Sequence, residues 1–193
     1  MIYKIIEKLK WFIWTPINRL YFMLKGVHYG KNLRSNGRIL IRKNGGEIAI
    51  GDDVRINSGL SYNPIGCGYR TSIQVLGGRL RIGSHVGMSN VSITCTDEII
   101  IGDWTDMGDG VKLFDTDFHS MVPSIRHSTK DFENAKKKGI SIGKNVFVGA
   151  NAMILKGSCL DDECCIGAGA IVTKNIGEKE TWVGNPARKI VKM

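Results

Sequence analysis

Between residues 142 and 176 the hydrophobic positions recur every six residues. The first residue of each six is aliphatic and the fifth is small or branched: Ile142, Val148, Ile154, Leu160, Ile166 and Val172 at the first position, and Val146, Ala152, Ser158, Cys164, Ala170 and Ile176 at the fifth. A period of six fits neither the alternation of one strand nor the 3.6-residue turn of a helix. It predicts a solenoid of three-sided coils, in which each six supplies one short strand and one corner and the aliphatic side chains of stacked coils point inward.

The end of the chain adds a second pattern. The stretch "IGAGAIVTKNI", which ends at residue 176, is followed by "VGNPARKI" at residues 183–190. With the six-residue repeat, these stretches resemble the closing signature of the hexapeptide-repeat acyltransferases, which include the maltose and galactoside O-acetyltransferases. The resemblance covers residues 45–190 and implies a left-handed parallel β-helix.

We therefore expect an all-β protein with three parts. A basic amphipathic helical segment and linker occupy residues 1–44, the β-helix residues 45–178, and a C-terminal cap residues 179–193. The helical segment is predicted to break at Thr15-Pro16, because proline is tolerated in a first helical turn but not inside a helix. The cap is predicted to close the end of the solenoid with a short strand or helix at residues 186–191.

The positive charge lies at one end of the chain. Residues 1–43 hold ten Lys and Arg against one acid, and the remainder holds seventeen of each sign, so this segment carries the whole excess of +9. It also contains four large aromatics, Trp11, Trp14, Tyr21 and Phe22. Such a segment is typical of a helix in a membrane interface, although a helix packed on the solenoid or on a neighbouring subunit fits equally well. Lysines interrupt the apolar positions, so we do not expect a membrane-spanning helix.

Residues 115–139 are the one long departure from the repeat. They contain Asp115, Asp117, His119, His127 and the charged run "KDFENAKKKG". A long loop inside a compact fold is usually functional or disordered, and insertions in solenoids emerge on one face, often the binding face. In the family that the chain resembles, an extruded loop at this place reaches over a neighbouring subunit and helps to form the active site.

Acyl transfer from a thioester to a hydroxyl needs a base that takes the proton of the attacking oxygen. A neutral imidazole does this at pH 7, and an adjacent acid can orient it. His119 opens the long loop, with Asp115 and Asp117 close by in the sequence, and the resemblance places a catalytic histidine here. We therefore predict His119 as the general base, and favour Asp117 over Asp115 as the orienting acid.

The resemblance also implies acetyl-CoA as the acyl donor, bound in a groove between two solenoids of a homotrimer. The positions that match the family's donor site are Phe147, Gly149, Ala150, Gly167, Ala168, Thr173, Lys174 and Arg188. Small residues would let the pantetheine arm approach the backbone, and Lys174 and Arg188 would neutralise phosphates. The coil itself also requires small residues at its corners, so the pattern alone does not separate the two roles.

Cysteine usage and known motifs narrow the remaining choices. Five cysteines without a Cys-x-x-Cys pair or a secretory signal predict a reduced, cytoplasmic protein, peripheral on the inner face of the cytoplasmic membrane where the helix binds lipid. Cys164 is expected to point inward as a small hydrophobe. The sequence contains no P-loop, no metal-binding motif and no nucleic-acid-binding motif.

These observations favour an acetyl-CoA-dependent O-acetyltransferase. We expect its acceptor to be a sugar hydroxyl, of a lipid-linked sugar or a surface-polysaccharide precursor. A sugar N-acyltransferase would use the same base and donor, and a non-catalytic trimeric scaffold would not need the loop. A metal-dependent hydratase resembling γ-type carbonic anhydrase would need three converging histidines, for which His85, His119 and His127 are the available set.

Overall fold

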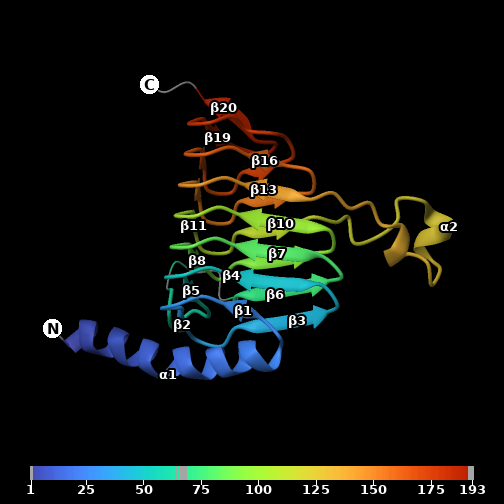
Figure 1. The fold of residues 1–193 in the computed structure, drawn as a ribbon. Coiled ribbons are helices and arrows are strands. Elements are labelled where there is room, and N and C mark those ends of the chain that lie inside the picture. Colours follow the sequence, from blue (N-terminus) through green and yellow to red (C-terminus); the bar gives the residue numbers. More distant parts are fainter. Residues whose placement is uncertain (1, 64, 66–68, 191–193) are drawn as a thin grey trace.

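The computed structural model describes residues 2–63, 65 and 69–190, and the side chains from Trp11 onward. The predictions for side chains before Trp11 and for residue 191 lie outside this part. The described chain forms a three-sided prism with a helix across one end and a long loop, which carries α2 (Pro123–Arg126), projecting from one side (Figure 1). Nearly all strand pairs are parallel, as expected for a solenoid whose successive coils stack on one another.

Three sheets form the sides of the prism, and the chain visits them in the order A, B, C. Sheet A contains β1 (His28–Tyr29), β4 (Glu47–Ile50), β7 (Arg79–Ile82), β10 (Glu98–Ile101), β13 (Ile140–Ile142) and β16 (Cys159–Leu160). Sheet B contains β2 (Arg34–Asn36), β5 (Arg55–Asn57), β8 (Gly87–Ser89), β11 (Asp106–Met107), β14 (Phe147–Val148), β17 (Cys165–Ile166), β19 (Thr181–Val183) and β20 (Arg188–Ile190). Sheet C contains β3 (Leu40–Asn44), β6 (Ser72–Leu76), β9 (Ser92–Cys95), β12 (Lys112–Phe114), β15 (Met153–Leu155) and β18 (Ile171–Val172).

The core is the interior of the prism, and it confirms the six-residue pattern. All twelve first and fifth positions between residues 142 and 176 are buried, Cys164 among them. Each coil places its inward side chains directly above those of the coil below, as in the register that pairs Leu113 with Ile154 and Ile154 with Val172. The hydrophobic effect therefore acts along one continuous column of aliphatic side chains.

The β-helix starts one coil earlier than predicted. Residues 28–44 are not a connector, because β1, β2 and β3 pair in parallel with β4, β5 and β6. Leu33, Ile39 and Ile41 are the buried aliphatic residues of this first coil. At the other end, β19 extends sheet B beyond residue 178, and β20 closes the sheet as an antiparallel strand, one of the two forms predicted for the cap.

The predicted break at Thr15-Pro16 is wrong, because α1 (Ile2–Leu24) is one continuous helix with Pro16 inside it. The ring of Pro16 lies on the exposed side, and the adjacent polar side chains bond to β2. Asn18 donates to Ser35 Oγ at 2.9 Å and to Gly37 O at 2.8 Å, which fastens the helix across the end of the prism. None of the helices in the described ranges is long and apolar enough to cross a membrane.

Candidate active site

The long insert leaves the prism at the corner between sheets C and A. It joins β12 to β13 and contains a short helix, α2 (Pro123–Arg126), and a 3-10 turn, η1 (Phe132–Asn134). A bridge between Thr116 and Lys137 closes its base. Figure 1 shows the insert projecting on the side opposite to β2, β5, β8 and β11 of sheet B. The interruption of the repeat is therefore a folded projection.

His119 lies in this insert and pairs with a carboxylate. Its Nδ1 atom is 2.6 Å from Asp131 Oδ2, and the other oxygen of Asp131 accepts the Ser120 N–H at 2.7 Å. The hydrogen bond from His119, and then that from Ser120, lowers the pKa of Asp131 below its usual value. An ionised carboxylate at Nδ1 selects the tautomer in which Nε2 carries the lone pair. The His119 side chain is 66% exposed, so Nε2 is available to a substrate.

The acids favoured from the sequence have other partners, so the prediction that Asp117 or Asp115 orients His119 is wrong. Asp117 Oδ1 binds Lys156 Nζ at 2.5 Å, one coil above the base of the insert. Asp115 is fully buried, and it accepts hydrogen bonds from Thr96 N, Thr96 Oγ1 and Asp97 N at 2.8 to 2.9 Å. Both acids hold the base of the insert. Asp131, twelve residues beyond His119, carried no sequence signal beyond its place in the charged run.

Five of the predicted donor-site residues lie together on sheet B and at its edge toward sheet C. Phe147 projects from β14 and is 53% exposed; Gly149, Ala150, Gly167 and Ala168 follow β14 and β17 in two stacked coils. A Cβ atom at Gly149 would lie 2.6 Å from Ala168 N, so stacking of the coils already requires this glycine. Phe147 is thus the one large side chain that this region offers to a ligand.

The other predicted donor residues divide between two places. Arg188 is exposed on β20, at the end of sheet B. Thr173 and Lys174 are exposed after β18, at the corner of sheets C and A, two coils above the base of the insert. Thr173 and Lys174 therefore lie in the same corner column as the insert that carries His119, whereas Phe147 and Arg188 lie on the opposite side of the prism.

The lower coils of sheet B carry a polar recess that the sequence pattern did not reveal. It has a volume of about 230 Å³ and is lined by Trp11, Arg55, Asn57, Gly87, Met88, Ser89, Asp106 and Met107. Asn57 Nδ2 donates to Ser89 Oγ at 3.2 Å, and Asn36 Nδ2 donates to Asn57 Oδ1 at 3.3 Å. Outward-facing residues alternate with core residues along each strand. The polar residues at the outward positions are therefore the sequence signal that could have revealed the recess.

The remaining histidines show no shared site. His85 occupies a left-handed corner, with φ of 61°, and stacks on Trp104 with ring centroids 3.9 Å apart. His127 ends α2, and His28 begins the first coil. Within the described ranges, no three His, Cys, Asp or Glu side chains are grouped so that they could hold a metal ion. The histidines therefore do not converge within the described part of one chain.

Comparisons with known proteins add three findings from sequence. The family pattern described as bacterial transferase hexapeptide (six repeats) matches residues 139–174. A protein of Mycobacterium tuberculosis named as a probable acetyltransferase is 32% identical over 190 residues, which cover 93% of this chain and 61% of that protein. A galactoside O-acetyltransferase of Lactococcus lactis is 30% identical over 100 residues, 51% of this chain and 46% of the relative. The chain spans less than two thirds of either relative.

Solved structures share the architecture. The N-acyltransferase AntD from Bacillus cereus, in complex with dTDP-4-amino-4,6-dideoxyglucose and coenzyme A, has a TM-score of 0.66 and 22% identity, covering 89% of this chain and 87% of that chain. A galactoside acetyltransferase in complex with coenzyme A has a TM-score of 0.52 and 22% identity, covering 86% of this chain and 64% of that chain. At this identity the likeness concerns the fold, and it confirms the left-handed parallel β-helix predicted from the repeat.

Proposed function

We propose that the protein, whose residues 139–174 match the bacterial transferase hexapeptide model, is an acetyl-CoA-dependent O-acetyltransferase that acts on a sugar hydroxyl. The observation that carries the proposal is the His119–Asp131 pair on the projecting insert. It supplies an exposed imidazole held in the tautomer that a general base requires.

In this mechanism, Nε2 of His119 takes the proton of the acceptor hydroxyl as its oxygen attacks the thioester carbonyl of the donor. Asp131 stabilises the imidazolium that forms, because its pKa is low and it remains ionised. The new C–O bond forms, the C–S bond breaks, and His119 returns the proton to the departing thiolate. General-base catalysis of this kind contributes about 10²- to 10⁴-fold.

We propose that a complete site needs two copies of the chain. His119, Thr173 and Lys174 belong to the corner of sheets C and A, whereas Phe147 and Arg188 belong to sheet B on the far side of the same prism. A cyclic trimer would place the corner of one protomer against sheet B of the next and would form three equivalent sites. The donor would then lie in the groove between the two, with Phe147 against it from one side and Lys174 from the other.

The recess below Phe147 supports a saccharide as the acceptor. Sugar hydroxyls are recognised by amides, hydroxyls and carboxylates, and Asn57, Ser89 and Asp106 present these groups side by side on neighbouring strands. Because the basic end of the prism lies next to this recess, we further propose a lipid-linked sugar or a nascent surface polysaccharide, met at the inner face of the cytoplasmic membrane. Acylation of a sugar amine remains the alternative outcome.

Mass spectrometry of a saccharide panel incubated with acetyl-CoA tests the activity. We expect one added acetyl group per acceptor molecule, and a loss of at least ~10²-fold for His119→Ala. Alkaline hydroxylamine removes an O-acetyl ester and leaves an N-acetyl amide, which separates the two acyltransferase alternatives. Unchanged turnover in His119→Ala would reject the mechanism.

A subunit-mixing experiment tests the shared site. His119→Ala removes the base from the half of the site at the corner of sheets C and A. Phe147→Glu blocks the donor in the half of the site on sheet B. Each homotrimer should be inactive, but a mixed trimer of either composition contains one interface with both halves intact, so about one third of its sites should work. If co-expressed, co-purified mixtures show no recovery, the two halves act within one chain and the shared site is refuted.

A further inference from the structure

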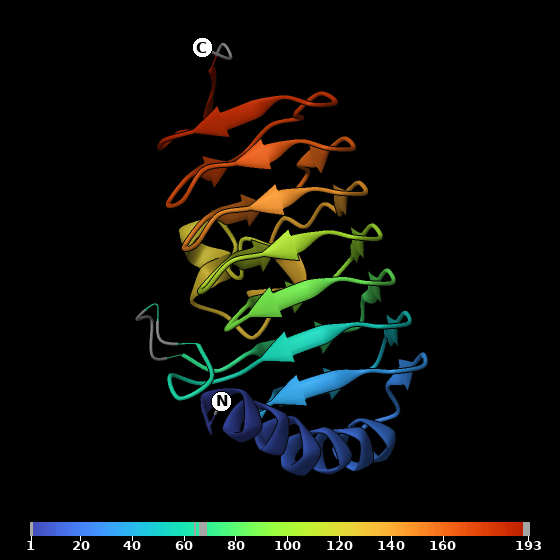
Figure 2. The ribbon, with the colours of Figure 1, turned by 90° about the vertical axis from the view of Figure 1, so that its left-hand side faces the viewer.

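The outer face of α1 is apolar and exposed. Between Trp11 and Leu24 this face contains no charged residue, and its side chains are 50 to 79% exposed at Phe12, Ile13, Ile17, Leu20, Met23 and Leu24. At 100° per residue these positions fall on one side of the helix. Both views of the fold place this helix below the first coil, at the end of the prism (Figure 2).

The inner face of α1 combines polar side chains with the fully buried Phe22, and the six exposed apolar residues face away from the prism. Asn18 is buried against β2, and Thr15 and Arg19 bond to the backbone of the first coil, Arg19 through Nη2 to Leu33 O at 2.8 Å. A helix that only capped the prism would turn its apolar side inward and its charges toward water. Phe22 meets this expectation, but the six exposed apolar residues form a strip that water alone does not stabilise.

Positive charge surrounds this apolar strip. Residues 11–43 contain seven Lys and Arg and no acid. Those of the first coil lie on successive sides of the prism, with Lys31 at the corner of sheets A and B, Arg34 on sheet B, Arg38 at the corner of sheets B and C, and Arg42 on sheet C, all of them exposed. The end of the prism therefore presents an apolar centre with a cationic rim.

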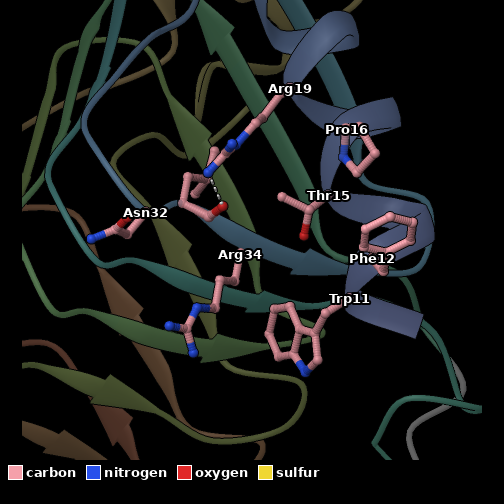
Figure 3. A pocket seen from close by; sticks show the side chains of 8 residues that line it. Trp11, Phe12, Thr15, Pro16, Arg19, Asn32 and Arg34 are labelled. Atoms are coloured by element: carbon pink, nitrogen blue, oxygen red, sulfur yellow. Dashed lines mark hydrogen bonds between the residues drawn. The ribbon is translucent and has the colours of Figure 1, made fainter. Parts of the chain in front are cut away.

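A cavity of about 590 Å³ lies between the helix and the rim. Figure 3 shows Trp11, Phe12, Thr15 and Pro16 on the helix side of this cavity, and the nitrogen-bearing ends of Arg19, Asn32 and Arg34 on the strand side. Leu33 completes the lining. One wall can therefore hold an alkyl chain while the other offers guanidinium donors, which bind phosphate oxygens in a bidentate manner.

We propose that this end of the prism docks on an anionic phospholipid bilayer, with the cavity taking a lipid phosphate and the apolar strip of α1 lying among the acyl chains. Interfacial helices combine an apolar face with basic flanks in this way, and each Lys or Arg near an anionic surface contributes about 1 kcal/mol. A second copy of the chain fits less well, because it would bring two cationic rims together. The face also points along the prism axis, away from the lateral sides that a trimer with shared sites would use.

Co-sedimentation with vesicles tests the proposal on the full-length protein. We expect tight binding to vesicles with 30% phosphatidylglycerol in phosphatidylcholine, at least tenfold weaker binding to pure phosphatidylcholine, and release in 1 M salt. Ile17→Asn combined with Leu20→Asn should weaken binding at least tenfold, because both side chains lie on the apolar strip. Arg34→Glu should weaken it about fivefold or more, since each charge contributes about that factor.

Matched variants provide the controls. Ile100→Asn and Arg81→Glu change the same residue types on exposed positions of sheet A, far from α1, and should bind like the unchanged protein. Circular dichroism and light scattering establish that each variant keeps its fold and oligomeric state. Equal binding of the α1 and sheet A variants would overturn the proposal. The proposal would also be overturned if the unchanged protein bound no vesicles while the α1 variants changed the oligomeric mass. The same holds if the unchanged protein bound free glycerol phosphate but no vesicles.

Discussion

Replacing Asp131 with asparagine tests the proposed catalytic pair of His119 and Asp131 with little change of shape. The carboxylate serves two donors at once, His119 Nδ1 at 2.6 Å and Ser120 N at 2.7 Å. An amide has only one oxygen, so one of the two donors loses its acceptor. If the amide nitrogen faces the ring, it stabilises the tautomer in which Nε2 carries the proton, and this form cannot act as the base.

The expected loss is moderate because the pair is partly open to solvent. The His119 side chain is 66% exposed, so water replaces part of the lost hydrogen bond. We expect kcat of Asp131→Asn to fall about 10- to 100-fold. The KM for acetyl-CoA should stay within about threefold, because the pair acts on the acceptor proton.

Continuous detection of the released thiol measures both constants. Asp117→Asn is the informative comparison, since Asp117 was the acid favoured by sequence and binds Lys156 instead. We expect its kcat to remain within about threefold of the unchanged protein. A larger loss in Asp117→Asn than in Asp131→Asn would refute the assignment of Asp131 as the orienting acid.

Three further predictions concern stability and reactivity. Burial, the largest cause, raises the pKa of the Cys95 and Cys164 thiols to about 12, so both should resist maleimide labelling at pH 8. Cys165, which is partly exposed on β17, should react, as peptide mapping would show. Asp115→Ala leaves the donors of Thr96 and Asp97 unpaired and should lower the free energy of unfolding by about 3 kcal/mol in urea titrations. The pKa of Asp131 is lowered, so its pairing stabilises the insert at pH values above the usual pKa of 3.8. This stabilisation is lost only as the pH falls below that value. Hydrogen exchange of the insert should therefore rise at pH 3 and not at pH 5.

The upper coils were predictable because the same packing constraint recurs in every coil. Each inward position between residues 142 and 176 must fill the same narrow interior, so the sequence repeats with the structure. The first coil escaped prediction because its β2 strand is buried against a helix. Ser35 and Asn36 are buried but polar, and Ser35 bonds to Thr15 and Asn18 of α1. The same contacts carry the helix through Pro16, so both errors have one tertiary cause.

The sequence singles out His119 as the candidate base, but it does not identify the carboxylate that pairs with it. His119 is conspicuous because it opens the one long interruption of a regular repeat. Its partner depends on how residues 120–131 fold back through α2 and η1, and no periodicity records that path. Choosing the acid nearest in sequence led to Asp117, which contacts the next coil instead. Short sequence distance is a poor guide within an insert, because its backbone is free of the register that fixes neighbouring coils.

Together, the proposed active site and the proposed membrane docking surface restrict how far from the membrane the acceptor group must lie. With the outer face of α1 on a bilayer, the prism axis stands upright, and the insert leaves the fourth coil, about 14 Å above the first at the usual spacing between strands. Because the apolar strip of α1 lies among the acyl chains, the helix adds only about half of its ~10 Å diameter, and the base of the insert lies roughly 15–20 Å above the membrane surface. A sugar attached directly to a lipid phosphate would lie at the membrane surface, beyond the reach of His119. We therefore expect acetylation of lipid-linked oligosaccharides at units distant from the lipid and none of lipid-linked monosaccharides in vesicles; equal acetylation of both would show that docking and catalysis do not occur in this orientation.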